Sequence, residues 1–433
     1  MRVAHVLHGW PAEEMGGTGL YVSALARALA SMGHEVAIVH PSASETPPIQ
    51  IDQGLSVHGL HVRKPRRWRD TWDGDVSRWT AWCRRWVPDV VHFHHLSGLP
   101  LGVIEATPCR RVLTLHDYAI PCARGQLVTA TLTPCTGPTS DACTRCLGPA
   151  LAGGRILATA GRILGRMPGL YKWARQKVRP PNISRHEDVT ARIASAQRAI
   201  QAAHCVLSPS HDLAARMVAM GFHDVKHTEL PLVQEIDRSP QPKEGPVRFL
   251  YASSVIPTKG PDRLVRAFRA LDGDARLTIA GHAPDFPTHP GFADAVKADA
   301  AADPRVTWLG PIPPQEMSAL LQRHDVLVLP SIWPENSPLI VREATRAGLS
   351  VIASAQGGAR ELAPDGSFVG SENDLLQSLK EAVSAGRIRH TSAEWPSPRA
   401  HAEVLLHGPY ISDGRGALEC ATLQPIPGTR SEA

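Results

Sequence analysis

The chain has 433 residues, which is enough for two domains of ordinary size. Its 43% hydrophobic and 20% charged residues are typical of globular proteins, and its net charge of +5 gives no argument for a nucleic-acid partner. No apolar run reaches the roughly 18 residues of a membrane span, and the N-terminus lacks the apolar core of a signal peptide. We therefore expect a cytoplasmic protein, in which stable disulfides among the eight cysteines are disfavoured.

The first part of the chain alternates short apolar runs with helix-like segments. Runs at 3–7 and 35–39 predict strands, and between them Gly16 to Gly19 open a helix with apolar residues on one face. Further buried strands are predicted at 87–93, 111–115 and 204–207. Such alternation is typical of a parallel sheet covered by helices.

The alternation restarts after a polar segment at 233–245, which has the composition of a linker. The second part is predicted to hold a helix at 261–271 and strands at 247–252, 276–280, 306–309 and 325–329. We predict an α/β fold with two Rossmann-like domains facing a central cleft, where ligands bind beyond the carboxyl ends of the strands. The predicted limits are 1–235 for the N-terminal domain with a cysteine-containing insertion at about 118–200, 246–395 for the C-terminal domain, and 396–433 for a crossover helix and a loose tail.

Two carboxylates, Glu335 and Glu343, flank a predicted helix start. Ser337 is suited to cap this helix, Pro338 suits its first turn, and Gly348 ends its apolar stripe. Free backbone N–H groups at a helix start attract anions, while a carboxylate accepts hydrogen bonds from sugar or ribose hydroxyls. The combination suits a nucleotide sugar.

Four further residues are candidates for the same ligand. Gly16 and Gly17 let backbone amides approach a phosphate or a sugar closely, although a plain glycine-rich turn is an equal alternative. Lys259 lies between a strand and a helix, where it can neutralise a departing diphosphate, and the alternative is an exposed surface lysine. His116 follows a strand and can transfer a proton or hydrogen-bond a sugar hydroxyl.

Two sets of side chains have residue types that bind metals in proteins. Four cysteines have the spacing C-x12-C-x7-C-x2-C, in which only the last pair has the spacing of a zinc knuckle: Cys122, Cys135, Cys143 and Cys146. We predict a structural zinc there, with free thiols and disulfides as alternatives. Three histidines that end a predicted strand are expected to line the cleft or to be structural rather than metal ligands: His92, His94 and His95.

Two segments, 63–69 and 145–185, are strongly basic, and the second has nine Lys or Arg and no Asp or Glu. Apolar residues are interleaved with these charges. Such a segment can rest on an anionic membrane surface or hold a lipid-linked pyrophosphate. The alternative is a solvated insertion of loops and helices.

In combination, these motifs resemble the retaining GT-B glycosyltransferase family 4, in its cysteine-containing bacterial subset, over roughly residues 1–395. The matching segments are MGGTGLYV at 15–22, PDVVH at 88–92, TLHD at 114–117, LSPS at 207–210, PTKG at 257–260, IAG at 279–281, the Glu-x7-Glu pair, and AQGGARE at 355–361. The chain departs from the family where Ser253 and Ser254 replace the usual Gly-Arg, so that the arginine expected to clamp the diphosphate is absent.

The resemblance implies a hexosyl- or related glycosyltransferase that moves a sugar from a UDP- or GDP-sugar with retention of configuration. The acceptor would be a polysaccharide, a lipid-linked molecule or a small molecule on the N-terminal domain, and the C-terminal domain would bind the donor nucleotide. Catalysis would need no metal cofactor, because Lys259 and helix ends supply the positive charge.

The resemblance also implies a role for each candidate residue. Lys259 would stabilise the leaving diphosphate, Glu343 would hold the ribose hydroxyls, and Glu335 would lie near the donor sugar. His116 would contact the sugar, and Gly17 the diphosphate or the acceptor. The helix start would touch sugar and phosphate through Asn336, Ser337, Pro338 and Leu339.

Two alternatives to a glycosyltransferase remain. One is a nucleotide-sugar epimerase of the same two-domain build, and the other is a non-catalytic zinc-knuckle interaction protein. The serine at 254 keeps the second alternative open, whereas the intact set of acids, lysine and histidine argues against it. We expect a cytoplasmic location, free or peripheral on the inner face of the membrane.

Overall fold

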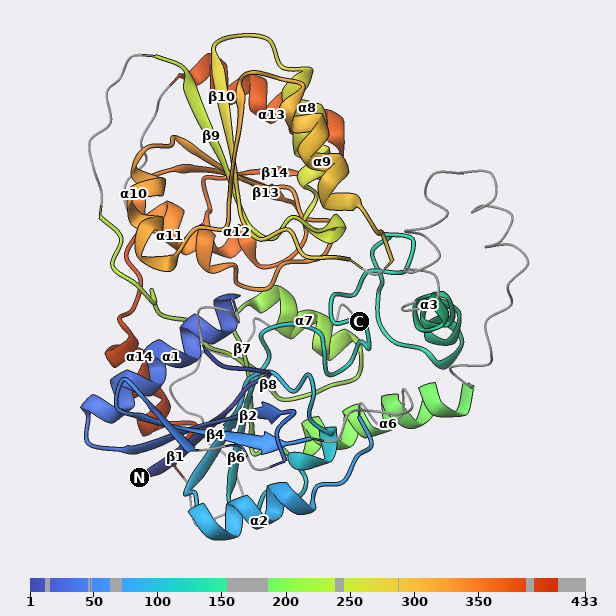
Figure 1. Cartoon of the computed structure of the whole chain (residues 1–433), viewed down its shortest axis with the longest axis vertical. Helices are drawn as coiled ribbons and strands as arrows, with labels where there is room; N and C mark the ends of the chain where they lie inside the picture. Colours follow the sequence, from blue (N-terminus) through green and yellow to red (C-terminus); the bar gives the residue numbers. More distant parts are fainter. Residues whose placement is uncertain are drawn as a thin grey trace, which may run out of the picture.

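The computed structural model describes residues 1–11, 16–45, 47, 49–62, 72–153, 186–237, 245–286, 288–386 and 393–411, with the side chains of 148–153 excepted. Two helix-covered sheets lie one above the other along the long axis of the molecule (Figure 1). The basic segment at 63–69, most of the basic segment at 145–185 and the predicted tail lie outside the described residues.

The first sheet has the strand order β3-β4-β2-β1-β5-β6-β7-β8, and its strands are parallel except for the pair β3 and β4. Its strands are β1 (Arg2–Val6), β2 (Glu35–Ser42), β3 (Ile49–Asp52), β4 (Leu55–His61), β5 (Val90–Phe93), β6 (Arg110–Thr114), β7 (Cys205–Ser208) and β8 (Val225–His227). The five strands predicted for this part are confirmed as β1, β2, β5, β6 and β7, whereas β3, β4 and β8 were not predicted.

The helices of the first part are α1 (Gly16–Ser31), α2 (Ser77–Trp86), η3 (Leu101–Val103), α3 (Ser140–Gly153), α6 (His186–Ala202) and α7 (His211–Ala219). α1 buries Tyr21 and its apolar stripe against one face of the sheet. On the other face, α2 buries three stacked indoles, Trp79, Trp82 and Trp86, with ring centroids 5.4 and 5.3 Å apart. Both faces of the sheet are therefore packed, as parallel sheets require.

The second sheet has the order β11-β10-β9-β12-β13-β14 and is parallel throughout. Its strands are β9 (Val247–Ala252), β10 (Ala275–Ala280), β11 (Val306–Gly310), β12 (Val326–Leu329), β13 (Ser350–Ser354) and β14 (Ser367–Val369). Its helices are η4 (Pro257–Lys259), α8 (Pro261–Arg269), α9 (Phe292–Ala301), η5 (Pro314–Glu316), α10 (Met317–Gln322), α11 (Leu339–Ala347), α12 (Ala359–Leu362) and α13 (Glu372–Ala385). The predicted strands β9 to β12 and the predicted helix α8 are confirmed.

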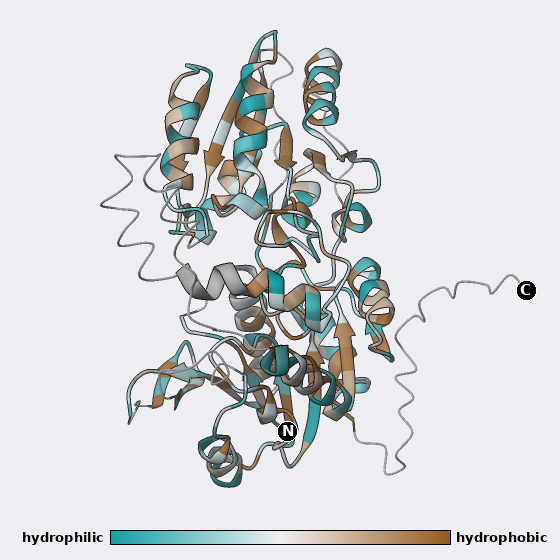
Figure 2. Ribbon diagram, turned by 90° about the vertical axis from the view of Figure 1, so that its right-hand side faces the viewer, coloured by the Kyte–Doolittle hydropathy of each residue, from teal (hydrophilic) through white to brown (hydrophobic). Residues whose placement is uncertain are grey.

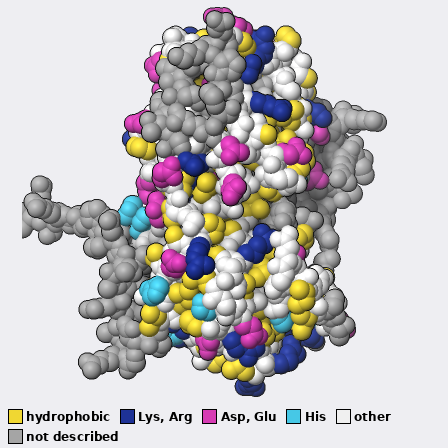
Figure 3. All heavy atoms as spheres, turned by 90° about the vertical axis from the view of Figure 1, so that its left-hand side faces the viewer, with side chains coloured by type: hydrophobic (Ala, Val, Ile, Leu, Met, Phe, Trp, Pro, Cys, Tyr) yellow, Lys and Arg dark blue, Asp and Glu magenta, His cyan; other side chains and the backbone are white. Residues whose placement is uncertain are grey.

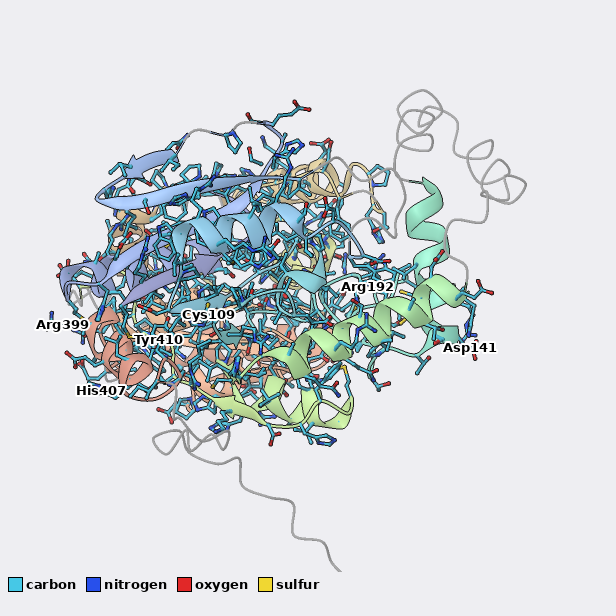
Figure 4. The ribbon with its side chains drawn as sticks, turned by 90° about the horizontal axis from the view of Figure 1, so that it is seen from below. Cys109, Asp141, Arg192, Arg399, His407 and Tyr410 are labelled. Carbon is cyan, nitrogen blue, oxygen red and sulfur yellow. The ribbon has the colours of Figure 1, made fainter. Side chains whose placement is uncertain are left out.

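The chain returns to the first sheet at its end. Helix α14 (Pro398–His407) packs against α1, and the Tyr21 hydroxyl is 2.9 Å from Nε2 of His401. Just beyond α14, the Tyr410 hydroxyl is 2.7 Å from Nδ1 of His92 on β5. Figure 4 shows Tyr410 and His407 together at this end of the molecule. α14 lies within 396–433, the range for which a crossover helix was predicted.

Several strands are largely hydrophobic, while the helices alternate hydrophobic and hydrophilic residues along their length (Figure 2). On the face seen in Figure 3, basic and acidic side chains are interspersed rather than gathered by sign. Within the described part of the chain, no helix is both long and apolar enough to cross a membrane.

Candidate active site

A cavity of about 410 Å³ lies between the two sheets and is lined from both sides. It brings together all ten residues that the sequence predicted for catalysis and donor binding: Gly16, Gly17, His116, Lys259, Glu335, Asn336, Ser337, Pro338, Leu339 and Glu343. The first three come from the first half of the chain and the other seven from the second. The carboxyl ends of parallel strands meet at this cavity, which explains why residues distant in sequence converge there.

Glu335 and Lys259 are paired. Lys259 Nζ donates to Oε1 of Glu335 at 2.6 Å, and the same oxygen accepts from Ser331 Oγ at 2.5 Å and from Trp333 Nε1 at 2.8 Å. The ammonium also lies over the Trp333 ring, 4.8 Å from its centroid. Glu335 is 4% exposed, so this carboxylate holds the lysine in a fixed position at the cavity wall. The sequence predicted separate roles for Lys259 and Glu335. It gave no indication that Trp333 belongs to the site.

Two glycines shape the backbone around Glu335. Gly357 has φ +93°, and a Cβ there would lie 2.3 Å from the Glu335 carbonyl oxygen. A Cβ at Gly358 would lie 1.9 Å from the Asn336 carbonyl oxygen, and the Gly358 N–H donates to the Glu335 carbonyl at 2.6 Å. The Gly-Gly pair of the AQGGARE motif is therefore needed because only glycine lets the two backbones approach this closely.

Helix α11 begins differently from the prediction. Its N-cap is Pro338, without a side-chain cap, whereas the Ser337 hydroxyl accepts a hydrogen bond from Nη2 of Arg342 at 3.1 Å. The prediction that Ser337 caps this helix is wrong, because the buried guanidinium takes its hydroxyl. The predicted end at Gly348 is confirmed, with φ +82°. The uncapped start leaves backbone N–H groups free for an anion.

Glu343 is a buried carboxylate at the cavity wall. It is 4% exposed, and burial raises the pKa of its carboxyl to about 7. Oε1 accepts a hydrogen bond from Nε2 of Gln234 at 2.8 Å. Gln234 also lines the cavity. It lies in the segment predicted to be a linker, and nothing in that polar segment distinguished Gln234 as a residue of the site.

His116 is an uncharged side chain. Burial lowers its pKa to about 3, and the neighbouring His95, His401 and His8 oppose the raising effect of Asp117. A ring that stays neutral at pH 7 is a poor proton donor but a good hydrogen-bonding group. Of the two roles predicted for His116, the structure therefore favours hydrogen bonding to a ligand.

Ser253 and Ser254 line the cavity in place of the family's Gly-Arg. Tyr251 donates its hydroxyl to the Ser254 carbonyl at 2.8 Å, and a Cβ at Gly281 would lie 2.0 Å from the Ser253 carbonyl. No arginine takes over the missing charge: among the described lining residues, Lys259 is the only Lys or Arg.

Asn336 joins the two halves of the molecule through its side chain. Its Nδ2 donates to the Leu115 carbonyl at 2.8 Å, and its Oδ1 accepts from the Ser210 hydroxyl at 2.7 Å. Asn336 is 3% exposed, so both bonds are shielded from water. Glu361 makes a second link, because its carboxylate accepts the backbone N–H groups of His211 and Asp212 at the start of α7.

Replacing Asn336 with alanine is expected to lower the free energy of unfolding by about 1–3 kcal/mol, because the Leu115 carbonyl and the Ser210 hydroxyl lose their buried partner. Denaturant-induced unfolding measures this loss. The matched control is Asn373→Ala, at an exposed position on α13, which should change stability by less than about 0.5 kcal/mol. Equal stabilities of the two variants would contradict the role given to Asn336.

The four cysteines predicted to bind zinc lie in the segment between β6 and α6 and carry no disulfide. Burial raises the pKa of Cys143, and Cys122, Cys135 and Cys146 add to this effect, so the four thiols are close in space. Their sulfurs do not include three that lie within 4.8 Å of one another. The buried guanidinium of Arg192 on α6, labelled in Figure 4, lies beside this cluster.

Comparison with known proteins agrees with this arrangement. The family described as Glycosyl transferases group 1 matches residues 233–386, and Glycosyltransferase Family 4 matches residues 15–136. A D-inositol 3-phosphate glycosyltransferase from Xylanimonas cellulosilytica is 27% identical over 365 residues, which are 81% of this chain and 78% of the relative. Another, from Corynebacterium aurimucosum, is 35% identical over 113 residues, or 25% of this chain and 27% of the relative.

Solved structures share the fold. Sucrose-phosphate synthase from Thermosynechococcus elongatus has a TM-score of 0.60 and 17% identity over 93% of this chain and 92% of that one. Anabaena Alr3699/HepE, in complex with UDP and glucose, has a TM-score of 0.56 and 13% identity over 94% of each chain. The predicted GT-B fold is thereby confirmed. The two family matches and the curated relatives complete the assignment: the chain belongs to glycosyltransferase family 4 and is an enzyme of the EC 2.4 class.

Proposed function

We propose that this enzyme transfers a sugar from a nucleoside diphosphate sugar, bound in the cavity between the two halves, with retention of the anomeric configuration. The donor nucleotide would lie on the second half, with the ribose at Glu343 and the diphosphate between Lys259 and the free start of α11. The donor sugar would lie toward His116 and Glu335.

One observation carries this proposal: a single cavity joins an ion-paired lysine, an uncapped helix start and a buried carboxylate. The lysine and the helix start both favour an anion, and the carboxylate favours hydroxyl donors. A nucleoside diphosphate has both kinds of group. The UDP complex of Alr3699/HepE, which has the same fold, supports this choice of ligand.

The acceptor is proposed to occupy a second cavity, of about 530 Å³, next to the first. Asp117 and Thr258 line it, and each neighbours a residue of the first cavity, so a molecule bound there would lie close to the donor sugar. Arg124, Trp72 and Gln126 offer polar and aromatic contacts suited to a hydroxyl-rich acceptor. A glycan, a lipid-linked molecule and a small molecule all remain acceptor candidates.

A donor screen tests the proposal. Purified enzyme is incubated with UDP- and GDP-sugars without acceptor, and slow release of nucleoside diphosphate identifies the donor. With an acceptor added, NMR of the product is expected to give the same anomeric configuration as the donor. An inverted product would refute retention, and failure of all nucleoside diphosphate sugars would refute the donor class.

Family membership favours transfer over the epimerase and over a non-catalytic interaction protein. No metal is proposed for catalysis, since the lysine and the helix start can stabilise the leaving diphosphate. Binding to an anionic membrane stays a prediction, because nearly all of the basic residues that motivate it lie outside the described part of the chain.

A structural zinc is proposed for the cysteine cluster. Cys122, Cys135, Cys143 and Cys146 are neighbours that would serve as the four ligands, and the nearby guanidinium of Arg192 would offset the charge of the thiolates. Metal analysis of protein purified without chelators is expected to give about one zinc per chain. Zinc should be lost in Cys143→Ser but kept in Cys109→Ser, whose cysteine lies outside the cluster. Metal-free wild-type protein would remove this proposal.

A further inference from the structure

A row of buried histidines lies behind His116. His94, just after β5, places Nδ1 3.2 Å from Nε2 of His116. On its other side, Nε2 of His94 is 2.9 Å from Nδ1 of His5 on β1. The three rings therefore form a hydrogen-bonded row that starts inside the first sheet and ends at the wall of the donor cavity.

All three rings are uncharged at neutral pH. Burial lowers the pKa of His5 to about 3 and of His116 to about 3, and it places the pKa of His94 well below its usual value. A neutral imidazole carries one N–H and one acceptor nitrogen. His94 bonds through both nitrogens, so it must donate to one neighbour and accept from the other. The row consequently has a direction, and all three tautomers change together if that direction reverses.

The inner end of the row decides the direction. Nε2 of His5 is fully buried and has no hydrogen-bond partner among the described residues. If His116 donated inward, the row would end in an N–H on this nitrogen with nothing to accept it. In the opposite direction the nitrogen carries only an unused lone pair. Buried N–H groups without an acceptor are the rarer of the two cases in proteins.

We propose that His5 and His94 are positioning residues that fix the tautomer of His116. His5 donates from Nδ1 to His94, and His94 donates from Nδ1 to Nε2 of His116. The proton of His116 then resides on Nδ1, which has no partner in the described part of the chain. His116 thus presents an N–H to the cavity, and it selects an oxygen acceptor on the ligand. That this ligand is the donor sugar rests on the proposed function.

His92 provides a matched control within the same cluster. Its ring centroid is 4.0 Å from that of His94, and it is equally buried. Its two nitrogens bond instead to the hydroxyls of Tyr410 and Thr114, both at 2.7 Å, so it takes no part in the row. Nitrogens of His5, His92 and His94 lie within 4.8 Å of one another, but these hydrogen bonds already occupy the nitrogens of His92 and His94.

The test reads the tautomer directly. Full-length protein is labelled with ¹⁵N-histidine, and long-range proton–nitrogen correlation spectra distinguish a protonated ring nitrogen from an unprotonated one. The His116 signals are assigned by their absence in His116→Gln. We expect wild-type His116 to carry its proton on Nδ1, whereas a proton on Nε2 would overturn the proposal whatever the activity.

Two variants test the cause. His5→Phe keeps a ring in place but removes the donor to His94, so the His116 signals should shift toward a mixture of tautomers and kcat/KM should fall roughly 3- to 10-fold. His92→Phe should leave the His116 tautomer unchanged. An unchanged tautomer in His5→Phe would overturn the role of His5. If the tautomer behaves as expected but His116→Gln transfers sugar at the wild-type rate, the row stands and the proposed contact with the donor sugar fails.

Discussion

Lys259→Met is expected to lower kcat/KM by about 100- to 1,000-fold, the usual effect of removing one group that stabilises negative charge in a transition state. A large effect is expected because Lys259 is the only Lys or Arg among the described residues of the cavity wall. The family's second cation is replaced by Ser254. The ion pair with Glu335 holds the ammonium in place before the ligand arrives, so little reorganisation is needed.

Steady-state kinetics with the donor identified by the screen measure this effect. The matched control is Lys297→Met, since Lys297 belongs to the same half and also lies over an indole ring, 6.0 Å from the centroid of Trp308. Lys297 does not line the donor cavity, and its loss should leave kcat/KM within about twofold. A loss of less than tenfold in Lys259→Met would contradict the proposed stabilisation of the diphosphate.

Glu343→Gln is expected to have two opposite effects, on binding and on stability. The variant loses the anionic acceptor proposed for the ribose hydroxyls, so KM for the donor should rise roughly tenfold or more. In the wild type, this KM should fall as pH rises through about 7, where the carboxyl ionises. The glutamine variant should lack this pH dependence.

The stability effect follows from the raised pKa. Below about pH 4.5 the side chain is protonated in both the folded and the unfolded chain, and ionisation has no effect. Between pH 4.5 and about 7 the unfolded chain ionises while the folded chain stays protonated, so the wild type loses stability as pH rises. With about 1.4 kcal/mol for each pKa unit, the loss is at most about 3 kcal/mol.

Glu343→Gln cannot ionise and should therefore gain stability relative to the wild type over this pH range. Unfolding followed at several pH values checks this. The control, Glu316→Gln, alters an exposed carboxylate near the cavity and should show no such gain. If the stability difference between Glu343→Gln and the wild type does not grow between pH 4.5 and 7, the Glu343 carboxyl does not have a raised pKa in the folded protein.

The strands that the sequence predicted are those with continuous apolar runs. β9, β10, β12 and β5 to β7 lie inside their sheets, where both faces are covered and the runs are unambiguous, whereas β11 was predicted although it lies at a sheet edge. β3 lies at a sheet edge, and its Ile49 and Ile51 are 61% and 73% exposed, so its residues carry no burial pattern. β8 and β14 have three residues each, too few for any periodicity.

In the candidate site, too, some residues could be predicted from the sequence and others could not. Glu335, Glu343, Lys259 and His116 could be found because their order and spacing along the chain follow a family pattern. Gln234 and Trp333 could not, since the fold alone brings Gln234 near Glu343 and Trp333 near Lys259. Ser337 was misassigned as a helix cap because the helix begins one residue later than predicted and Arg342, in the helix itself, donates to the Ser337 hydroxyl.

The sequence by itself determined the two largely parallel sheets, the family and the set of residues around one cavity, because these depend on local hydrophobicity and on motif order. The tertiary structure alone decided the charge and pairing of those residues. The lysine became the partner of Glu335, Glu343 acquired a pKa near 7, and His116 became a neutral ring at the end of a row. Burial and contacts between residues far apart in the chain set these properties, and neither is encoded in the spacing of a motif.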